Sequence, residues 1–84
     1  MKKIQLEAAL KFRLENVDGQ DIIFCYDERI NEYFAMDAKY YSALVLLSKG
    51  ITEQDLFAQQ NDLNIDLLVR GLRYRKLVFD SLEE

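Results

Sequence analysis

The sequence contains no histidine, no proline and only one cysteine among its 84 residues. Histidine is the commonest general base and the commonest metal ligand, so its absence argues against an independent enzyme or a metal site. A single cysteine excludes an internal disulfide and an all-cysteine metal site. Cys25 lies in the apolar stretch 22–26, where it is either a small buried hydrophobe or a reactive thiol. The lack of proline leaves no proline-rich linker.

Long apolar runs are also missing, and none approaches the length of a membrane span. The first residues lack the apolar segment of a signal peptide, so a cytoplasmic location is expected. The net charge of −4 does not favour attraction to nucleic acid or to an anionic membrane. We therefore expect neither as a partner.

The composition is that of a folded domain, with 50% apolar and 31% charged residues. The length predicts one domain over residues 1–84, with a core at about residues 10–79. A chain this short buries a modest share of its surface and has little room for a deep catalytic cavity. No catalytic carboxylate pair, phosphate loop or metal-ligand spacing is found. We therefore predict no catalytic residue, no metal and no cofactor.

The first half of the chain has the patterns of strands. Apolar residues alternate with polar ones from Ile4 to Leu14, most clearly from residue 10, and the earlier residues are a strand extension or a loose arm. Residues 16–19 favour a turn. The nearly all-apolar segment 21–26 predicts a central strand.

A polar break at residues 27–29 then predicts a turn before a third strand over residues 30–36. Period-two alternation divides this strand into two faces. One face carries Ile30, Glu32, Phe34 and Met36, and the other carries Asn31, Tyr33 and Ala35.

The second half has the patterns of helices. Asp37 is suited to cap a helix that closes at Gly50. Thr52 is expected to cap a short second helix, with Leu56 and Phe57 packing inward. The predicted third helix spans residues 65–75.

Its start and its end can also be predicted. Asn64 or Asp62 is its expected cap, and its Leu68 and Leu72 are expected to face the core. Residues 77–79 are expected to pack back on the domain, and residues 80–84 to form a polar tail. The fold class is therefore α+β, with a three-stranded antiparallel sheet followed by three helices.

This order of elements resembles the winged-helix peptide-binding domains of ribosomal peptide modification systems, the precursor-peptide recognition elements. The family includes the small chaperone of pyrroloquinoline quinone biosynthesis and the leader-binding proteins of lasso peptide clusters. The resemblance covers residues 10–79. It rests on the strand 33–37 before a helix that ends at 46–50, then on segment 51–56 and the last helix. One departure is Arg75-Lys76, where members often have glycine.

The resemblance implies a non-catalytic, winged-helix-like recognition domain. Its partners would be the leader of a precursor peptide and a modifying enzyme, such as a radical enzyme, a protease or a cyclase. The leader would add as a strand to the third strand and lie against the third helix. The implied peptide-binding residues are Asn31, Glu32, Tyr33, Phe34, Ala35, Leu67, Arg70, Gly71 and Tyr74.

Three of these residues, Phe34, Gly71 and Arg70, also have a simpler explanation. Phe34, like Met36, fits the core as well as a groove. Gly71 interrupts a helix, which indicates close approach by either a peptide backbone or the domain's own sheet. Arg70 and Arg73 either pair with acidic side chains of a leader or are solvated at a helix end.

Two other functions fit the sequence. Arg70, Arg73, Arg75 and Lys76 could hold the phosphates of DNA, although helix-dipole stabilisation accounts for them as well and Asp62 and Asp66 begin the same helix. A structural subunit that dimerises through an edge strand is the other alternative. The free protein is expected to be a monomer or a weak homodimer.

Overall fold

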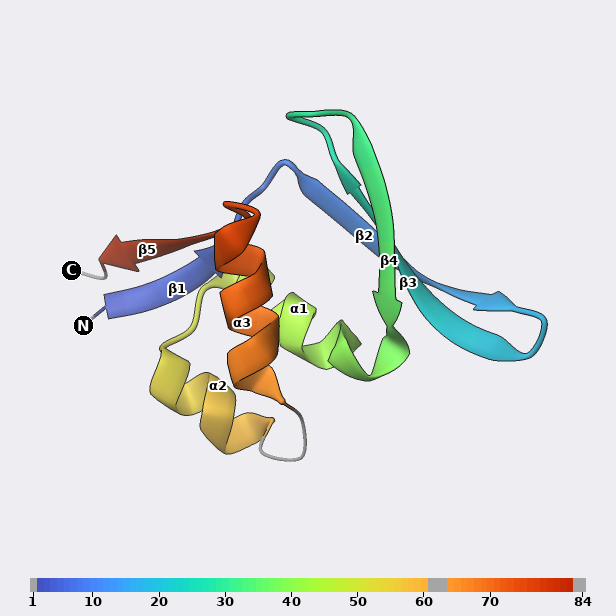
Figure 1. Cartoon of the computed structure of the whole chain (residues 1–84). Helices are drawn as coiled ribbons and strands as arrows, with labels where there is room; N and C mark the ends of the chain where they lie inside the picture. Colours follow the sequence, from blue (N-terminus) through green and yellow to red (C-terminus); the bar gives the residue numbers. More distant parts are fainter. Residues whose placement is uncertain (1, 61–63, 83–84) are drawn as a thin grey trace.

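The computed structural model describes residues 2–60 and 64–82 and has an α+β architecture. Its elements, in chain order, are β1 (Lys2–Leu6), β2 (Leu10–Val17), β3 (Gln20–Asp27), β4 (Glu32–Asp37), the 3₁₀ turn η1 (Ala38–Tyr40), α1 (Tyr41–Lys49), α2 (Glu53–Gln59), α3 (Ile65–Tyr74) and β5 (Val78–Leu82). The predicted three-stranded antiparallel sheet followed by three helices is confirmed. The helices lie on one side of that sheet (Figure 1).

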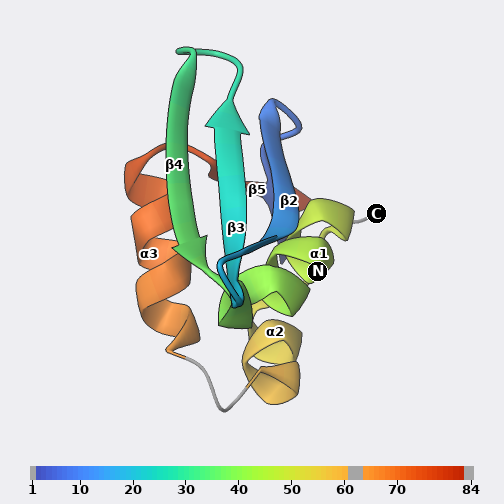
Figure 2. The same ribbon diagram turned by 90° about the vertical axis from the view of Figure 1, so that its right-hand side faces the viewer.

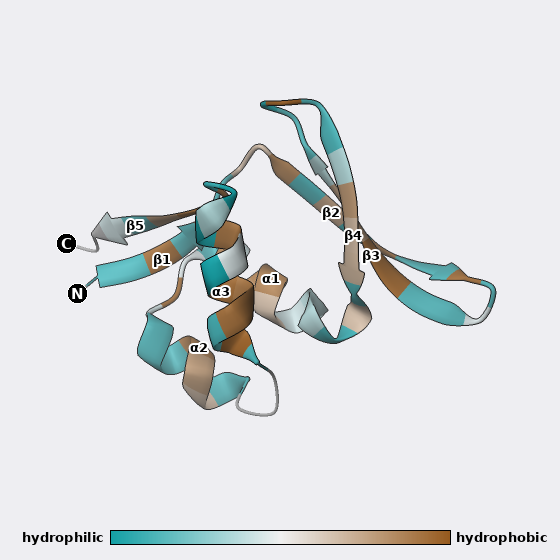
Figure 3. Ribbon diagram, viewed as in Figure 1, coloured by the Kyte–Doolittle hydropathy of each residue, from teal (hydrophilic) through white to brown (hydrophobic). Residues whose placement is uncertain are grey.

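Strands β2, β3 and β4 form an antiparallel meander. The predicted turn after β2 is present, since Asp18 and Gly19 both have positive φ, at 53° and 82°. Positive φ at both central residues matches the twist of a two-residue hairpin. The expected alternation along β2 appears as bands of brown and teal in Figure 3.

The turn between β3 and β4 is longer than predicted. Ile30 is exposed in this turn, so its assignment to the third strand was wrong. The strand begins at Glu32, because Asn31 takes a φ of 54° that ends the ladder. Asparagine tolerates this left-handed conformation better than a branched residue does.

A second, two-stranded sheet joins the two ends of the described chain. β1 pairs with β5 along its whole length, so the expected polar tail at 80–84 is wrong for its described residues. The backbone of Ile4 also exchanges hydrogen bonds of 2.8 and 3.0 Å with Ile51. The segment before residue 10 is therefore neither a loose arm nor an extension of β2.

The helix boundaries largely follow the predicted caps. Asp37 accepts a hydrogen bond from the Lys39 amide at 2.9 Å, and Thr52 accepts one from Asp55 at 3.1 Å. Gly50 ends α1 with a φ of 85°. At α3, Asn64 holds the cap position without a side-chain hydrogen bond.

Two further predictions concern the packing of α2 and the cap of α3. Phe57 is exposed, so its predicted inward packing was wrong, whereas Leu56 of the same helix is fully buried. The alternative α3 cap, Asp62, lies outside the described residues.

The core lies between the three-stranded sheet, the small sheet and the helices. Its buried apolar residues are Ile4, Leu6, Leu10, Ile23, Cys25, Ala43, Leu44, Leu47, Ile51, Leu56, Ile65, Leu68, Val69, Leu72, Leu77 and Val78. Burial of each large aliphatic side chain contributes about 1.5–3 kcal/mol. Burial also raises the pKa of the Cys25 thiol to about 11, which makes this residue a core hydrophobe and not a reactive thiolate.

Candidate functional site

β4 is an edge strand of the three-stranded sheet. The strand order is β2-β3-β4, and within residues 2–60 and 64–82 no strand pairs with the other side of β4. In an antiparallel ladder, alternate residues of an edge strand direct their amides and carbonyls away from the sheet. Figure 2 shows β4 at this edge with α3 behind it. A row of backbone donors and acceptors therefore borders the space next to α3.

A groove of about 300 Å³ lies between β4 and α3. Its lining residues are Phe34, Ala35, Met36, Tyr40, Leu67, Leu68, Gly71, Leu72 and Arg75. Phe34 and Met36 lie two residues apart on one face of β4, and the helical residues recur at the three- and four-residue spacing of one helix face. The groove thus joins two regular faces, one from a strand and one from a helix.

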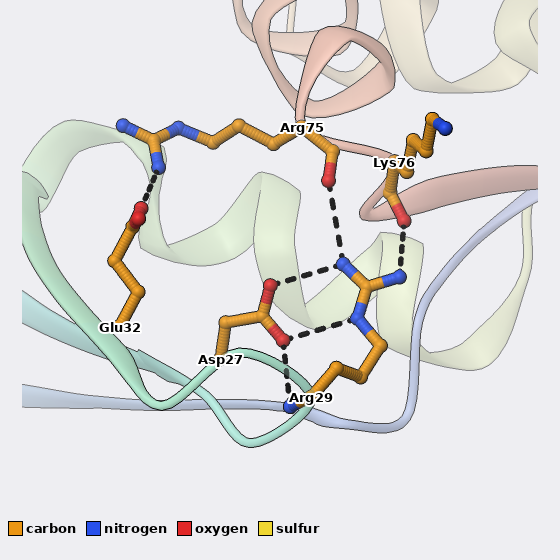
Figure 4. A network of polar contacts seen from close by, with 5 residues as sticks. All are labelled: Asp27, Arg29, Glu32, Arg75 and Lys76. Atoms are coloured by element: carbon orange, nitrogen blue, oxygen red, sulfur yellow. Dashed lines mark hydrogen bonds and ion pairs between the residues drawn. The ribbon is translucent and has the colours of Figure 1, made fainter.

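Arg75 marks one end of this groove. Its guanidinium lies over the Phe34 ring, 4.3 Å from the centroid, which is the geometry of a cation–π contact. Its Nη1 donates to Oε1 of Glu32 at 2.5 Å (Figure 4). The basic end of α3 therefore lies against the first residue of β4.

A second contact ties the β3–β4 turn to the end of α3. Arg29 donates to the backbone carbonyls of Lys76 at 2.8 Å and Arg75 at 3.3 Å, and it holds the buried carboxylate of Asp27 (Figure 4). The hydrogen bonds from Arg29 hold the pKa of Asp27 below its ordinary value. We call this Asp27–Arg29 pair, with the two carbonyls, the tether.

The end of α3 has its own local explanation. Leu77 donates its amide to the carbonyl of Leu72 at 2.8 Å, and Lys76 donates to that of Arg73 at 2.9 Å. This pair of bonds is a Schellman motif, in which the residue after the cap has positive φ. Lys76 has a φ of 60°, so lysine occupies a position where glycine is preferred.

Four of the residues predicted to bind a peptide line the groove, namely Phe34, Ala35, Leu67 and Gly71. Glu32 lies at its end through the ion pair with Arg75. A Cβ atom on Gly71 would meet nothing within 4 Å, which removes the explanation of this glycine by close packing on the domain's own sheet. The absent side chain leaves groove volume open instead.

The other four predicted residues are not among those lining the groove. Asn31 lies in the β3–β4 turn and accepts a hydrogen bond from the Tyr26 hydroxyl at 2.7 Å. Tyr33 is 74% exposed and stacks on Tyr26, with ring centroids 4.5 Å apart. Arg70 pairs with Asp66 on its own helix, and Tyr74 is 89% exposed.

Sequence reasoning missed five lining residues: Met36, Tyr40, Leu68, Leu72 and Arg75. Leu68 and Leu72 were predicted to face the core, and Met36 to fit the core as well as a groove. Leu68 and Leu72 belong to the core, and Met36 and Tyr40 pack against it, because a side chain can border a core and a groove at once. Arg75 follows Gly71 by four residues, and this spacing was the available signal for one helix face.

The basic cluster at the end of α3 is largely paired within the chain. Arg73 donates to Glu53 at 2.8 Å and to Asp80 at 3.2 Å, and Arg75 pairs with Glu32. With the Arg70–Asp66 pair included, carboxylates already pair with three of the four basic residues considered for DNA. This arrangement weakens the case for phosphate binding.

The chain matches no model of a protein family, and comparisons with curated proteins and with solved structures gave no match. Among the described residues, no helix has the length and apolar character needed to cross a bilayer.

Proposed function

We propose that the protein binds the leader segment of a ribosomally made precursor peptide as an added strand on β4. The groove between β4 and α3 is the single observation that carries this proposal, because it combines a free strand edge with apolar side-chain pockets. Backbone pairing supplies affinity in this binding mode, and alternate side chains supply specificity.

The proposal assigns a role to each wall of the groove. β4 donates and accepts the main-chain hydrogen bonds, while Phe34 and Met36 contact every second side chain of the peptide. Leu67, Leu68 and Gly71 of α3 contact the same side chains from the other wall. This arrangement agrees with the winged-helix recognition domains that the sequence resembles.

The biological role follows from this mode of binding. The domain is a non-catalytic, cytoplasmic recognition subunit that presents the precursor to a modifying enzyme, such as a radical enzyme, a protease or a cyclase. A strand held by its backbone leaves the remainder of the peptide free, so the part to be modified stays accessible to that enzyme.

The test is a titration of the ¹⁵N-labelled protein with the precursor peptide encoded nearest to its gene. We expect amide shifts confined to β4 and to residues 67–75, together with slowed hydrogen exchange of outward β4 amides. Shifts confined to the exposed face of β2 and β3 would contradict the site. No shift at millimolar peptide, with shifts at the end of α3 on addition of duplex DNA, would replace this function with DNA binding.

The dependence of affinity on salt concentration also distinguishes peptide binding from DNA binding. Binding to phosphates weakens steeply as the salt concentration rises, because counterions are released. Strand addition into an apolar groove depends less on salt. We therefore expect the affinity to fall by less than about tenfold between 50 and 200 mM salt, against the roughly 10³–10⁵-fold losses typical of six to ten phosphate contacts.

A further inference from the structure

Arg75 is the only charged residue among the described residues that line the groove. The other lining residues are apolar or, in the case of Tyr40, aromatic with a hydroxyl. Its guanidinium lies over the ring of Phe34, so the charge sits directly at the apolar surface that a bound side chain would contact. A ligand in this groove therefore meets one positive charge at a defined end.

The ion pair between Arg75 and Glu32 is weak enough for another carboxylate to replace Glu32. The ion pair with Glu32 involves one guanidinium nitrogen, Nη1, and the two side chains are 44% and 47% exposed. Pairs this exposed contribute little to stability, because water screens the charges and two long side chains must be ordered. A guanidinium has further N–H groups, and its flat fork suits a carboxylate held through two bonds.

We propose that Arg75 selects peptides with two apolar residues at alternate positions and a carboxylate two residues from the nearer of them. This carboxylate replaces Glu32 as the partner of Arg75. The inference rests on the proposed strand addition to β4. Arg75 keeps its place over Phe34 and exchanges one carboxylate for another, so the charge stays compensated in both states.

The register of β4 defines the motif. Met36, Phe34 and Glu32 share one face of the strand at two-residue intervals. A strand added beside β4 places its own alternate side chains at the same three levels. The two apolar side chains lie level with Met36 and Phe34, and the carboxylate lies level with Glu32, within reach of Arg75.

The direction of the added strand fixes the order of the motif. β4 runs from Glu32 to Asp37, so an antiparallel peptide reaches the Arg75 end last. Its sequence is then apolar, any residue, apolar, any residue, acidic. A parallel peptide carries the same residues in the reverse order, with the acidic one first.

The experiment is a selection from a displayed library of random decapeptides on the immobilised full chain and, in parallel, on Arg75→Gln. We expect the wild-type protein to enrich the two apolar residues with the acidic one at this spacing. The Arg75→Gln protein should enrich the apolar pair without the acid. An Arg75→Lys protein should keep the preference in weakened form, because the charge remains while the planar fork is lost.

Two synthetic peptides are then compared: one from the selection, and its twin in which the acidic residue is replaced by its amide. The quantity to measure is the ratio of their dissociation constants. We expect the wild-type protein to bind the acidic peptide about threefold or more tightly than its twin, because the new ion pair replaces an exposed one of modest strength. Arg75→Gln should bring this ratio close to one. Glu32→Gln should tighten binding of the acidic peptide, because the competing carboxylate is gone.

A matched control is Arg13→Gln, which removes an arginine from the exposed part of β2 and should leave the ratio unchanged. A ratio that persists in Arg75→Gln overturns the inference. Enrichment of apolar pairs without any acid on the wild-type protein also overturns it, and leaves strand addition standing. Recovery of no peptide at all overturns the inference together with the proposed function.

Discussion

Arg29 holds the buried carboxylate of Asp27 through two side-chain hydrogen bonds of 3.0 Å each, from Nε and from Nη2. The same guanidinium reaches the two last carbonyls of the α3 terminus. Arg29 therefore joins the turn before β4 to the end of α3 and so sets the distance between them. β4 and α3 are the two walls of the groove.

The tether makes stability depend on pH in the acid range. Hydrogen bonds from Arg29 lower the pKa of Asp27 below its ordinary value, so the folded protein binds this proton less readily than the unfolded chain. The contribution of Asp27 is complete above that ordinary pKa and is lost as pH falls through the lowered pKa. We expect Asp27→Asn to flatten the fall in stability below about pH 4, measured by urea unfolding at each pH.

Asp80 gives the matched control for this measurement. Lys2 and Arg73 lower its pKa in the same direction, but it lies in β5, away from the tether. Asp80→Asn should also flatten the acid limb while leaving the groove unchanged. Only Asp27→Asn should move the amide resonances of residues 32–36. Unmoved resonances in that variant would show that the tether does not set the distance between β4 and α3.

A second prediction concerns β1. Ile4 is 2% exposed and pairs with Ile51 through its backbone, so its side chain is part of the core. Ile4→Ala should lower the free energy of unfolding by about 2–5 kcal/mol, the range for truncating buried aliphatic residues. Thermal and urea unfolding measure this loss. The control Leu14→Ala, at a largely exposed position of β2, should cost clearly less, and equal costs would argue against burial of β1.

The strands and helices were largely predictable because their signals are local. The turn at Asp18 and Gly19, the cap at Asp37 and the cap at Thr52 each depend on residues within a few positions. β5 was missed for the opposite reason. Val78–Leu82 has no clear alternation, and its strand state depends on β1, which lies at the other end of the chain.

The groove was predictable in outline and not in detail. Period two along β4 and helical spacing in α3 identified its walls through Phe34 and Gly71. Tyr33 does not line the groove although Ala35 does, and the sequence could not separate them because alternation gives two faces without saying which one is covered. Arg75 was missed because its contact with Phe34 joins residues far apart in the chain.

A third prediction follows from the Schellman motif. A non-glycine residue in the left-handed conformation costs about 1 kcal/mol. Because Lys76 has a φ of 60°, Lys76→Gly should stabilise the protein by about this amount and raise Tm by about 4–8 °C, measured by calorimetry. Lys76→Ala is the control, since it removes the charge but keeps the Cβ. An equal rise in both variants would assign the gain to charge and not to conformation.

Gly71 provides the prediction that separates the groove from the fold. A glycine inside a helix costs about 1 kcal/mol relative to alanine, and a Cβ at this position meets nothing within 4 Å. Gly71→Ala should therefore stabilise the free protein by about that amount.

Gly71→Leu should retain stability but fill the groove, and should weaken binding of the precursor peptide about tenfold or more. Gln54→Leu, on an exposed position of α2, adds the same side chain away from the groove and should bind as the wild type does. A stabilised Gly71→Leu protein that binds peptide normally would show that the peptide does not occupy this groove, because the fold would be intact and only the space between β4 and α3 would have changed.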